Sequence, residues 1–155
     1  MTEELSPAGY AQAIDDARQR LLRFVQGCTD GEWHEAPVDG DPRPAGVIAD
    51  HVAHAYEYLA GWITDLTAGR AVDVNAEIVD DLNAEHAADA AGVTQSHVAG
   101  HLRSAGDELV ALVAGLRPEQ LDLGDGRVRR LAIIAARHAD THRDELQAGL
   151  AAVTG

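Results

Sequence analysis

Two structural features are excluded by what this sequence lacks. Cysteine occurs once, at Cys28, so no internal disulfide can form. The longest apolar run, residues 109–116, is far shorter than the ~18 residues that a transmembrane helix needs. Aromatic residues make up only 4% of the chain, while alanine is frequent. Small side chains with the highest helix propensity therefore have to supply much of the packing, which favours closely packed helices.

Positive charge is also scarce. The chain has 26 acidic and 12 basic residues, no lysine, and a formal net charge of -14. Phosphate backbones and anionic lipids repel such a chain, so we expect no nucleic-acid or membrane partner. Residues 1–10 are acidic and lack the apolar segment of a secretion signal. Together with the single cysteine, this predicts a cytoplasmic location.

Length and composition are typical of one globular domain. The 155 residues are 46% hydrophobic and 25% charged, which is sufficient for a core without disulfides or structural metals. We therefore expect a single domain over residues 1–155. Alanine-rich helices leave faces on which a second copy can pack, so a homodimer is a further expectation.

Apolar residues recur at helical spacing in four segments. These are residues 6–26, 44–68, 94–116 and 128–150, joined by residues 29–43, 70–92 and 122–127. Ser6 and Thr94 are suitable N-cap residues, and Pro7 occupies the favoured first helical position. The acidic connection 70–92 fits either a short helix or an ordered loop. The pattern predicts an all-α four-helix bundle, and the two long connections leave its topology open.

Eight histidines are the main chemical signal, and the fourth helix carries the most informative pair. His138 and His142 are four residues apart, which places both on one helix face. They fall within the apolar stripe that includes Leu131, Ile134 and Leu146, so both are expected to point into the bundle. Buried imidazoles need partners. A shared metal ion is one such partner, and hydrogen bonds within the core are the alternative.

The second helix contributes a third inward histidine. His51 shares a face with apolar residues, whereas His54 aligns with Asp50 and Asp65 on what we interpret as the solvated side. Side chains from facing helices are the usual source of metal ligands in bundles. His51, His138 and His142 therefore form a candidate metal site.

The remaining candidates have simpler interpretations. His97 and His101 share a row with polar residues on the third helix, so we expect them to face solvent. His34 and His86 lie in polar connections and are expected at the surface. Cys28 continues the apolar stripe of the first helix, which predicts a small buried side chain rather than a nucleophile.

Two motifs resemble the DinB-like family, which includes the N-terminal domain of mycothiol-dependent maleylpyruvate isomerases. They are DHVAHAYEYL at residues 50–59 and RHADTHRDEL at residues 137–146, with weaker similarity at Trp33 and at residues 82–87. The resemblance implies an up-down-down-up four-helix bundle and a divalent metal ion. Carried over by position, its ligands are His51, His138 and His142. The isomerase branch has glutamate at the position of His138 and a further C-terminal domain, so we do not expect maleylpyruvate isomerisation.

The same resemblance implies a function. A low-molecular-weight thiol such as mycothiol or bacillithiol would bind the metal, zinc by first expectation and nickel as an alternative, and attack a small electrophile as thiolate. Arg137 and Arg143 flank the ligands and are candidates for holding a carboxylate, or else ordinary surface arginines. Two other functions stay open: a non-catalytic metal-binding, small-molecule-binding or sensor module, and a metal-free bundle that acts through protein contacts.

Overall fold

The computed structural model describes residues 4–154, and these contain helices and no β-strand. The helices are α1 (Pro7–Gly27), α2 (Asp30–His34), α3 (Ala45–Thr67), α4 (Ala76–Asp89), α5 (Gln95–Ala114), a 3-10 helix (Pro118–Asp122) and α6 (Leu123–Thr154). Within these residues, none of the helices has the length and hydrophobicity needed to cross a membrane. The expected all-α bundle is confirmed.

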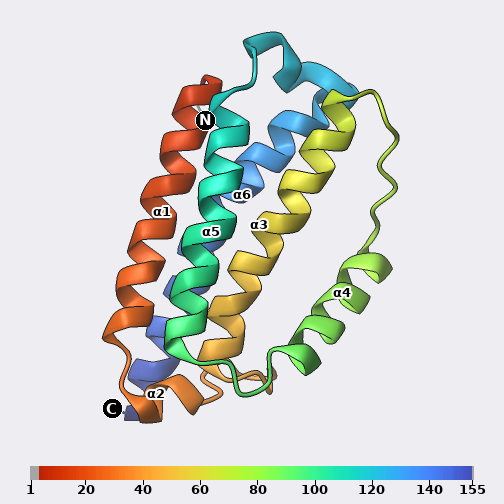
Figure 1. Cartoon of the computed structure of the whole chain (residues 1–155). Helices are drawn as coiled ribbons and strands as arrows, with labels where there is room; N and C mark the ends of the chain where they lie inside the picture. The colour runs from red at the N-terminus through yellow and green to blue at the C-terminus, as the bar shows by residue number, and fades with distance from the viewer. Residues whose placement is uncertain (1–3, 155) are drawn as a thin grey trace.

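The four long helices, α1, α3, α5 and α6, form the bundle in up-down-down-up order. In Figure 1, α1 and α6 run in one direction, while α3 and α5 run in the other. Helix α1 packs on α5 and α6, and α3 packs on the same two helices from the opposite side. The core between them contains fully buried side chains from each helix, among them Ile14, Tyr56, Leu102, Leu109 and Leu146. This arrangement brings α3 and α6 into contact, which places the candidate ligands on facing helices.

Local signals define the helix ends as expected. Ser6 Oγ accepts a hydrogen bond from the amide of Gly9, and Thr94 Oγ1 accepts one from the amide of His97. The expected turn before the last helix is also present, because residues 124–126 all have positive φ within α6. Regular helix therefore begins after Gly126.

The two long connections are more ordered than their sequences indicate. Residues 30–34 form α2, which Thr29 and Glu32 cap reciprocally. Residues 76–89 form α4, with Asn75 as its N-cap. Figure 1 shows α4 outside the four-helix bundle and next to α3. Its hydrophobic periodicity is weak because His86 is its only buried residue, and this explains why the sequence left helix and loop equally open.

Helix α2 fixes the start of α3, the helix that carries His51. Trp33 is 3% exposed, and its indole nitrogen donates to the carbonyl of Val93 at 2.9 Å. Its ring lies directly against Gly46, where an added Cβ would be only 2.5 Å from the indole. Glycine at this position therefore allows α2, α3 and the start of α5 to meet closely.

Candidate metal centre

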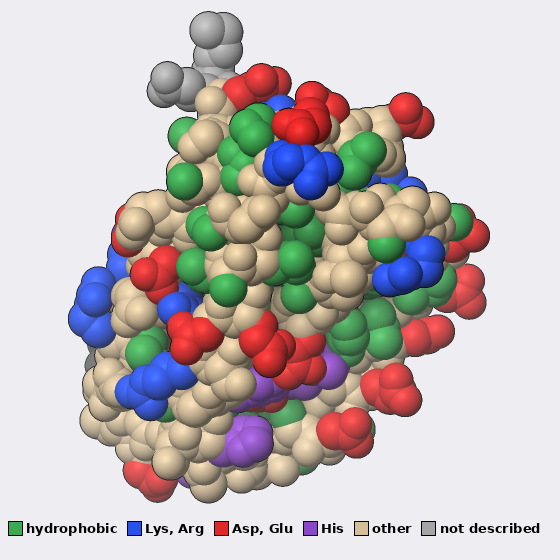
Figure 2. Space-filling view, turned by 45° about the horizontal axis from the view of Figure 1, so that its top comes forward, with side chains coloured by type: hydrophobic (Ala, Val, Ile, Leu, Met, Phe, Trp, Pro, Cys, Tyr) green, Lys and Arg blue, Asp and Glu red, His purple; other side chains and the backbone are tan. Residues whose placement is uncertain are grey.

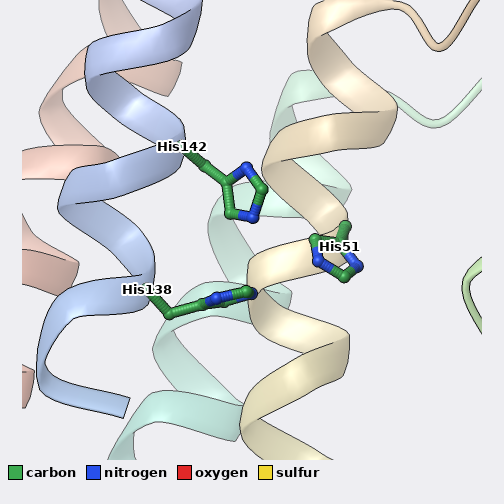
Figure 3. A group of neighbouring side chains, drawn as sticks. All are labelled: His51, His138 and His142. Atoms are coloured by element: carbon green, nitrogen blue, oxygen red, sulfur yellow. The ribbon is translucent and has the colours of Figure 1, made fainter. Parts of the chain in front are cut away.

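The structure brings His51, His138 and His142 together. Their rings point toward a common space between α3 and α6 (Figure 3). The ring centroids of His51 lie 5.1 Å from those of both His138 and His142, and the latter two are 4.6 Å apart. One nitrogen from each ring lies within 4.8 Å of the others. Such a spacing suits three ligands of one ion, with metal–nitrogen bonds of ~2.0–2.1 Å.

Two of these imidazoles have buried nitrogens without a hydrogen-bond partner among the described residues. They are Nδ1 of His51 and Nε2 of His138. Burial of an unsatisfied polar atom costs roughly 1–3 kcal/mol, so native proteins usually provide a partner. A metal ion bound between the rings would satisfy the donor set, since neutral imidazole is a preferred zinc ligand. The residues present therefore fit a divalent ion.

The protonation states favour the same conclusion. Burial, followed by the neighbouring histidines, lowers the pKa of His51 to about 3. Burial and the nearby His142 lower the pKa of His138 to about 4. Burial also lowers the pKa of His142, whose Nδ1 lies 3.2 Å from Glu145 Oε2. The three rings are thus neutral near pH 7, which is the form that binds metals, and Glu145 orients one of them.

An apolar cavity of about 620 Å³ opens beside the three histidines. Its walls come from α3, α6, α4 and residues 72–74, and they include Leu59, Trp62, Leu82 and Ile134. Ile134 is 49% exposed, although its position in the stripe predicts a core residue. The expectation was wrong because the helix face of His138 continues along this cavity instead of packing in the core.

A second polar cluster contains the residues that sequence reasoning placed wrongly in solvent. Asp50 is 4% exposed and His86 is 5% exposed. Asp50 Oδ2 lies 2.7 Å from Nε2 of His86, and Oδ1 lies 2.7 Å from Nδ1 of His101. His101 also bonds Glu57, and His54 stacks on His86 with ring centroids 4.7 Å apart. Figure 2 shows histidine side chains emerging among acidic ones on the viewed face.

The incorrect prediction that these residues face solvent has a physical cause. The helical wheel of α3 assumes one covered face, but α4 and α5 cover the side that carries Asp50 and His54. His86 reaches Asp50 from 36 residues away, so no local pattern in α4 reveals the contact. The signal that was available is a carboxylate at position 50 within an otherwise apolar stretch, since buried carboxylates require partners. His97 and His34 are exposed, as expected.

Hydrogen bonds connect the side chains of this cluster. Asp50, His97 and His101 have ligand atoms within 4.8 Å of one another. However, both ring nitrogens of His101 already bond carboxylates, one on Asp50 and one on Glu57. Burial tends to raise the pKa of Asp50, but hydrogen bonds from His101 and His86 hold it well below its usual range. Asp50 thus ties α3 to both α4 and α5.

The network makes stability depend on pH in the alkaline range. The hydrogen bonds to Asp50 and Glu57 raise the pKa of His101 from 6.5 to about 9. Because the folded pKa exceeds the unfolded one, the stabilisation is complete below about pH 6.5 and is lost as pH rises through about 9. We expect the free energy of unfolding to fall by roughly 1–3 kcal/mol between about pH 7 and about pH 10.

Urea unfolding at a series of pH values measures this loss. Between about pH 7 and about pH 9, below the range in which the Cys28 thiol also contributes, His101→Gln should lose much less stability than the native chain. The variant His97→Gln, one turn earlier in the same helix, should lose as much as the native chain. The other titratable neighbour on α3 is His54, and burial lowers its pKa, so it is already neutral in this range. An equal alkaline loss in His101→Gln and the native chain would contradict the assignment.

Other candidates from the sequence do not join the centre. The cavity is lined by Arg43, Arg127 and Arg130 rather than by Arg137 or Arg143. Arg143 instead pairs with Asp140 and Asp144. Cys28 forms the C-cap of α1 and is half-buried, and burial raises the pKa of its thiol to about 11. The thiol form therefore predominates at neutral pH, as expected for a side chain that is not a nucleophile.

Comparison with known proteins supports the same fold. The solved structure of the sibling lethal factor precursor DfsB superposes with a TM-score of 0.71 over 94% of this chain and 95% of that one, at 20% sequence identity. At this identity the likeness concerns the fold alone. No match was found among curated proteins. The sequence pattern of the DinB superfamily matches residues 13–154, which include all three clustered histidines. The chain therefore belongs to the DinB superfamily.

Proposed function

We propose that this chain is a metal-dependent S-transferase, in which His51, His138 and His142 hold one divalent ion that activates a low-molecular-weight thiol. The observation that carries the proposal is the set of three neutral imidazoles at the wall of an apolar cavity, two of them with buried nitrogens that have no hydrogen-bond partner in the described part of the chain. Three protein ligands leave a position open, which is typical of catalytic zinc sites. Imidazole ligands suit zinc first, and nickel is the alternative.

A bound divalent ion would supply Lewis acidity, which deprotonates a coordinating thiol at neutral pH. The chain contributes the positioning. Glu145 fixes the ring of His142, and the apolar walls exclude water that would compete with sulfur for the electrophile. In the net reaction the thiol sulfur bonds to the electrophilic carbon, the carbon releases its leaving group with the bonding electrons, and the thiol proton passes to solvent.

Incubation of zinc-loaded or nickel-loaded protein with a thiol and monobromobimane tests the proposal. With mycothiol or bacillithiol, we expect a fluorescent thioether to form faster than in buffer, and a chelator should remove the enhancement. The variant His51→Ala should lose it as well. His34→Ala provides the matched control, because His34 is an exposed histidine on α2.

One result of this experiment would contradict the proposed transferase function. If metal-loaded protein accelerates conjugation with neither thiol, the transferase function is wrong. Retained metal would then favour a non-catalytic metal-binding, small-molecule-binding or sensor module on the same bundle.

A further inference from the structure

The cavity beside the histidines is large and almost entirely apolar in its middle section. At about 620 Å³ it falls within the range of small-molecule sites, which are ~300–1,000 Å³ and carry a few polar groups on apolar walls. Water would gain few hydrogen bonds against Leu59, Leu131 and Ile134, so an apolar ligand is favoured over water there.

The two ends of this cavity differ chemically. On α6, the histidines are at one end of the lining stripe and Arg127 and Arg130 at the other. Arg130 and His138 are eight residues apart, which corresponds to about 12 Å along an α-helix. A ligand that reaches both ends is therefore elongated, with an apolar body between two polar termini.

The arginine end is suited to an anion. Neither Arg127 nor Arg130 has a carboxylate within 4 Å among residues 4–154, although the chain carries a net charge of -14. Arg127 donates one hydrogen bond to the carbonyl of Val72 at 2.6 Å, and Arg130 donates one to the carbonyl of Asp125 at 3.1 Å. Each guanidinium has five N–H donors, so both retain donors for a ligand.

The third cavity arginine is different. Arg43 lies toward the histidine end and forms a two-pronged ion pair with Asp41, with nitrogen–oxygen distances of 2.7–3.1 Å. Its charge is already balanced. The unbalanced positive charge of the cavity is therefore concentrated at the end away from the proposed metal.

We propose that the cavity binds an elongated apolar molecule with an anionic group at one end, the anion at Arg127 and Arg130 and the other end at the histidines. The role of this molecule rests on the proposed function. It is the electrophile of the reaction, with its reactive carbon next to the three-histidine centre. The thiol would occupy only the metal end, where its sulfur reaches the proposed ion.

Binding of decanoate to metal-free protein tests the pocket independently of any catalysis. Trp62 lines the cavity, so its fluorescence should report binding, and Trp62→Phe should remove the signal. We expect decanoate to bind about tenfold more tightly than decanol, and Arg130→Gln to reduce this preference. Arg137→Gln is the matched control, because Arg137 is exposed on the same helix and lies outside this cavity.

Two outcomes would overturn the pocket assignment. One is equal binding of decanoate and decanol by the native protein. The other is decanoate binding that requires zinc and is unaffected by Arg130→Gln, since the carboxylate would then bind at the metal end. Binding to the metal-free protein with the expected arginine dependence would support the pocket even if bimane conjugation failed, so the two proposals fail separately.

Turnover tests the orientation. With zinc and thiol present, decanoate bearing a terminal bromide should react with the thiol more efficiently than the corresponding bromo-alcohol. Arg130→Gln should raise KM for the acid about tenfold and leave KM for the alcohol unchanged. An equal effect on both substrates would contradict the placement of the anion at this arginine.

Discussion

Replacement of His142 by alanine should lower the affinity for zinc at least a hundredfold. Loss of a residue that merely orients a ligand costs 10–100-fold in metal affinity, and His142 supplies one of only three imidazoles. The substitution should leave the metal-free fold largely intact, because the side chain of His142 borders the cavity and, among the described residues, hydrogen-bonds only Glu145. Competition with a chromophoric chelator measures the affinity directly.

Thermal unfolding provides a second measure of the same change. Zinc at about a hundred times its Kd should stabilise the native protein by about 2.7 kcal/mol, and this increment should disappear in His142→Ala. His34→Ala controls for zinc that binds an exposed imidazole. Unchanged zinc affinity in His142→Ala would remove the basis for the metal centre and leave three buried imidazoles without a ligand.

Replacement of Asp50 by alanine should destabilise the protein by about 3 kcal/mol, because removal of one partner from a buried charged network leaves the others unpaired. The nearly inaccessible ring of His86 would lose its carboxylate, and His101 would keep only Glu57. Denaturant unfolding measures the loss. Glu57→Gln is the matched control, because its exposed carboxylate bonds the same histidine and should contribute less than about 1 kcal/mol.

The variant Asp50→Ala should also loosen α4 selectively. His86 is the only buried residue of that helix, and Asp50 is its hydrogen-bond partner. Hydrogen exchange over residues 76–89 should therefore accelerate more in Asp50→Ala than exchange in the four bundle helices. Uniform acceleration, or a destabilisation no larger than that of Glu57→Gln, would show that Asp50 does not anchor α4.

The three-histidine cluster could be predicted because each step is local. His138 and His142 share a helix face by spacing alone, and His51 follows the apolar stripe of α3. Bundle geometry then requires those stripes to face inward. The order of the helices is not local, and only the family resemblance indicated the up-down-down-up arrangement that Figure 1 shows.

The cavity and the Asp50 network could not be predicted in this way. A stripe of apolar residues has the same pattern whether it packs against a helix or lines a cavity, as Ile134 illustrates with 49% exposure. The contact of His86 with Asp50 joins two segments whose individual patterns are weak. Similarly, the arginines that reach the cavity are set by the position of the turn at residues 124–126, rather than by nearness to the histidines in sequence.

The outer wall of the cavity is built largely by helix α4, of which only His86 is buried. Helix α4 and residues 72–74 line the cavity from outside the bundle, held by His86 and by the bond from Arg127 to Val72. Apart from His86 and Val72, the side chains of this wall can therefore change without altering the packing of the helices that carry the imidazoles. If the cavity binds the ligand proposed above, this wall could change the ligand preference while the three histidines on α3 and α6 stay the same.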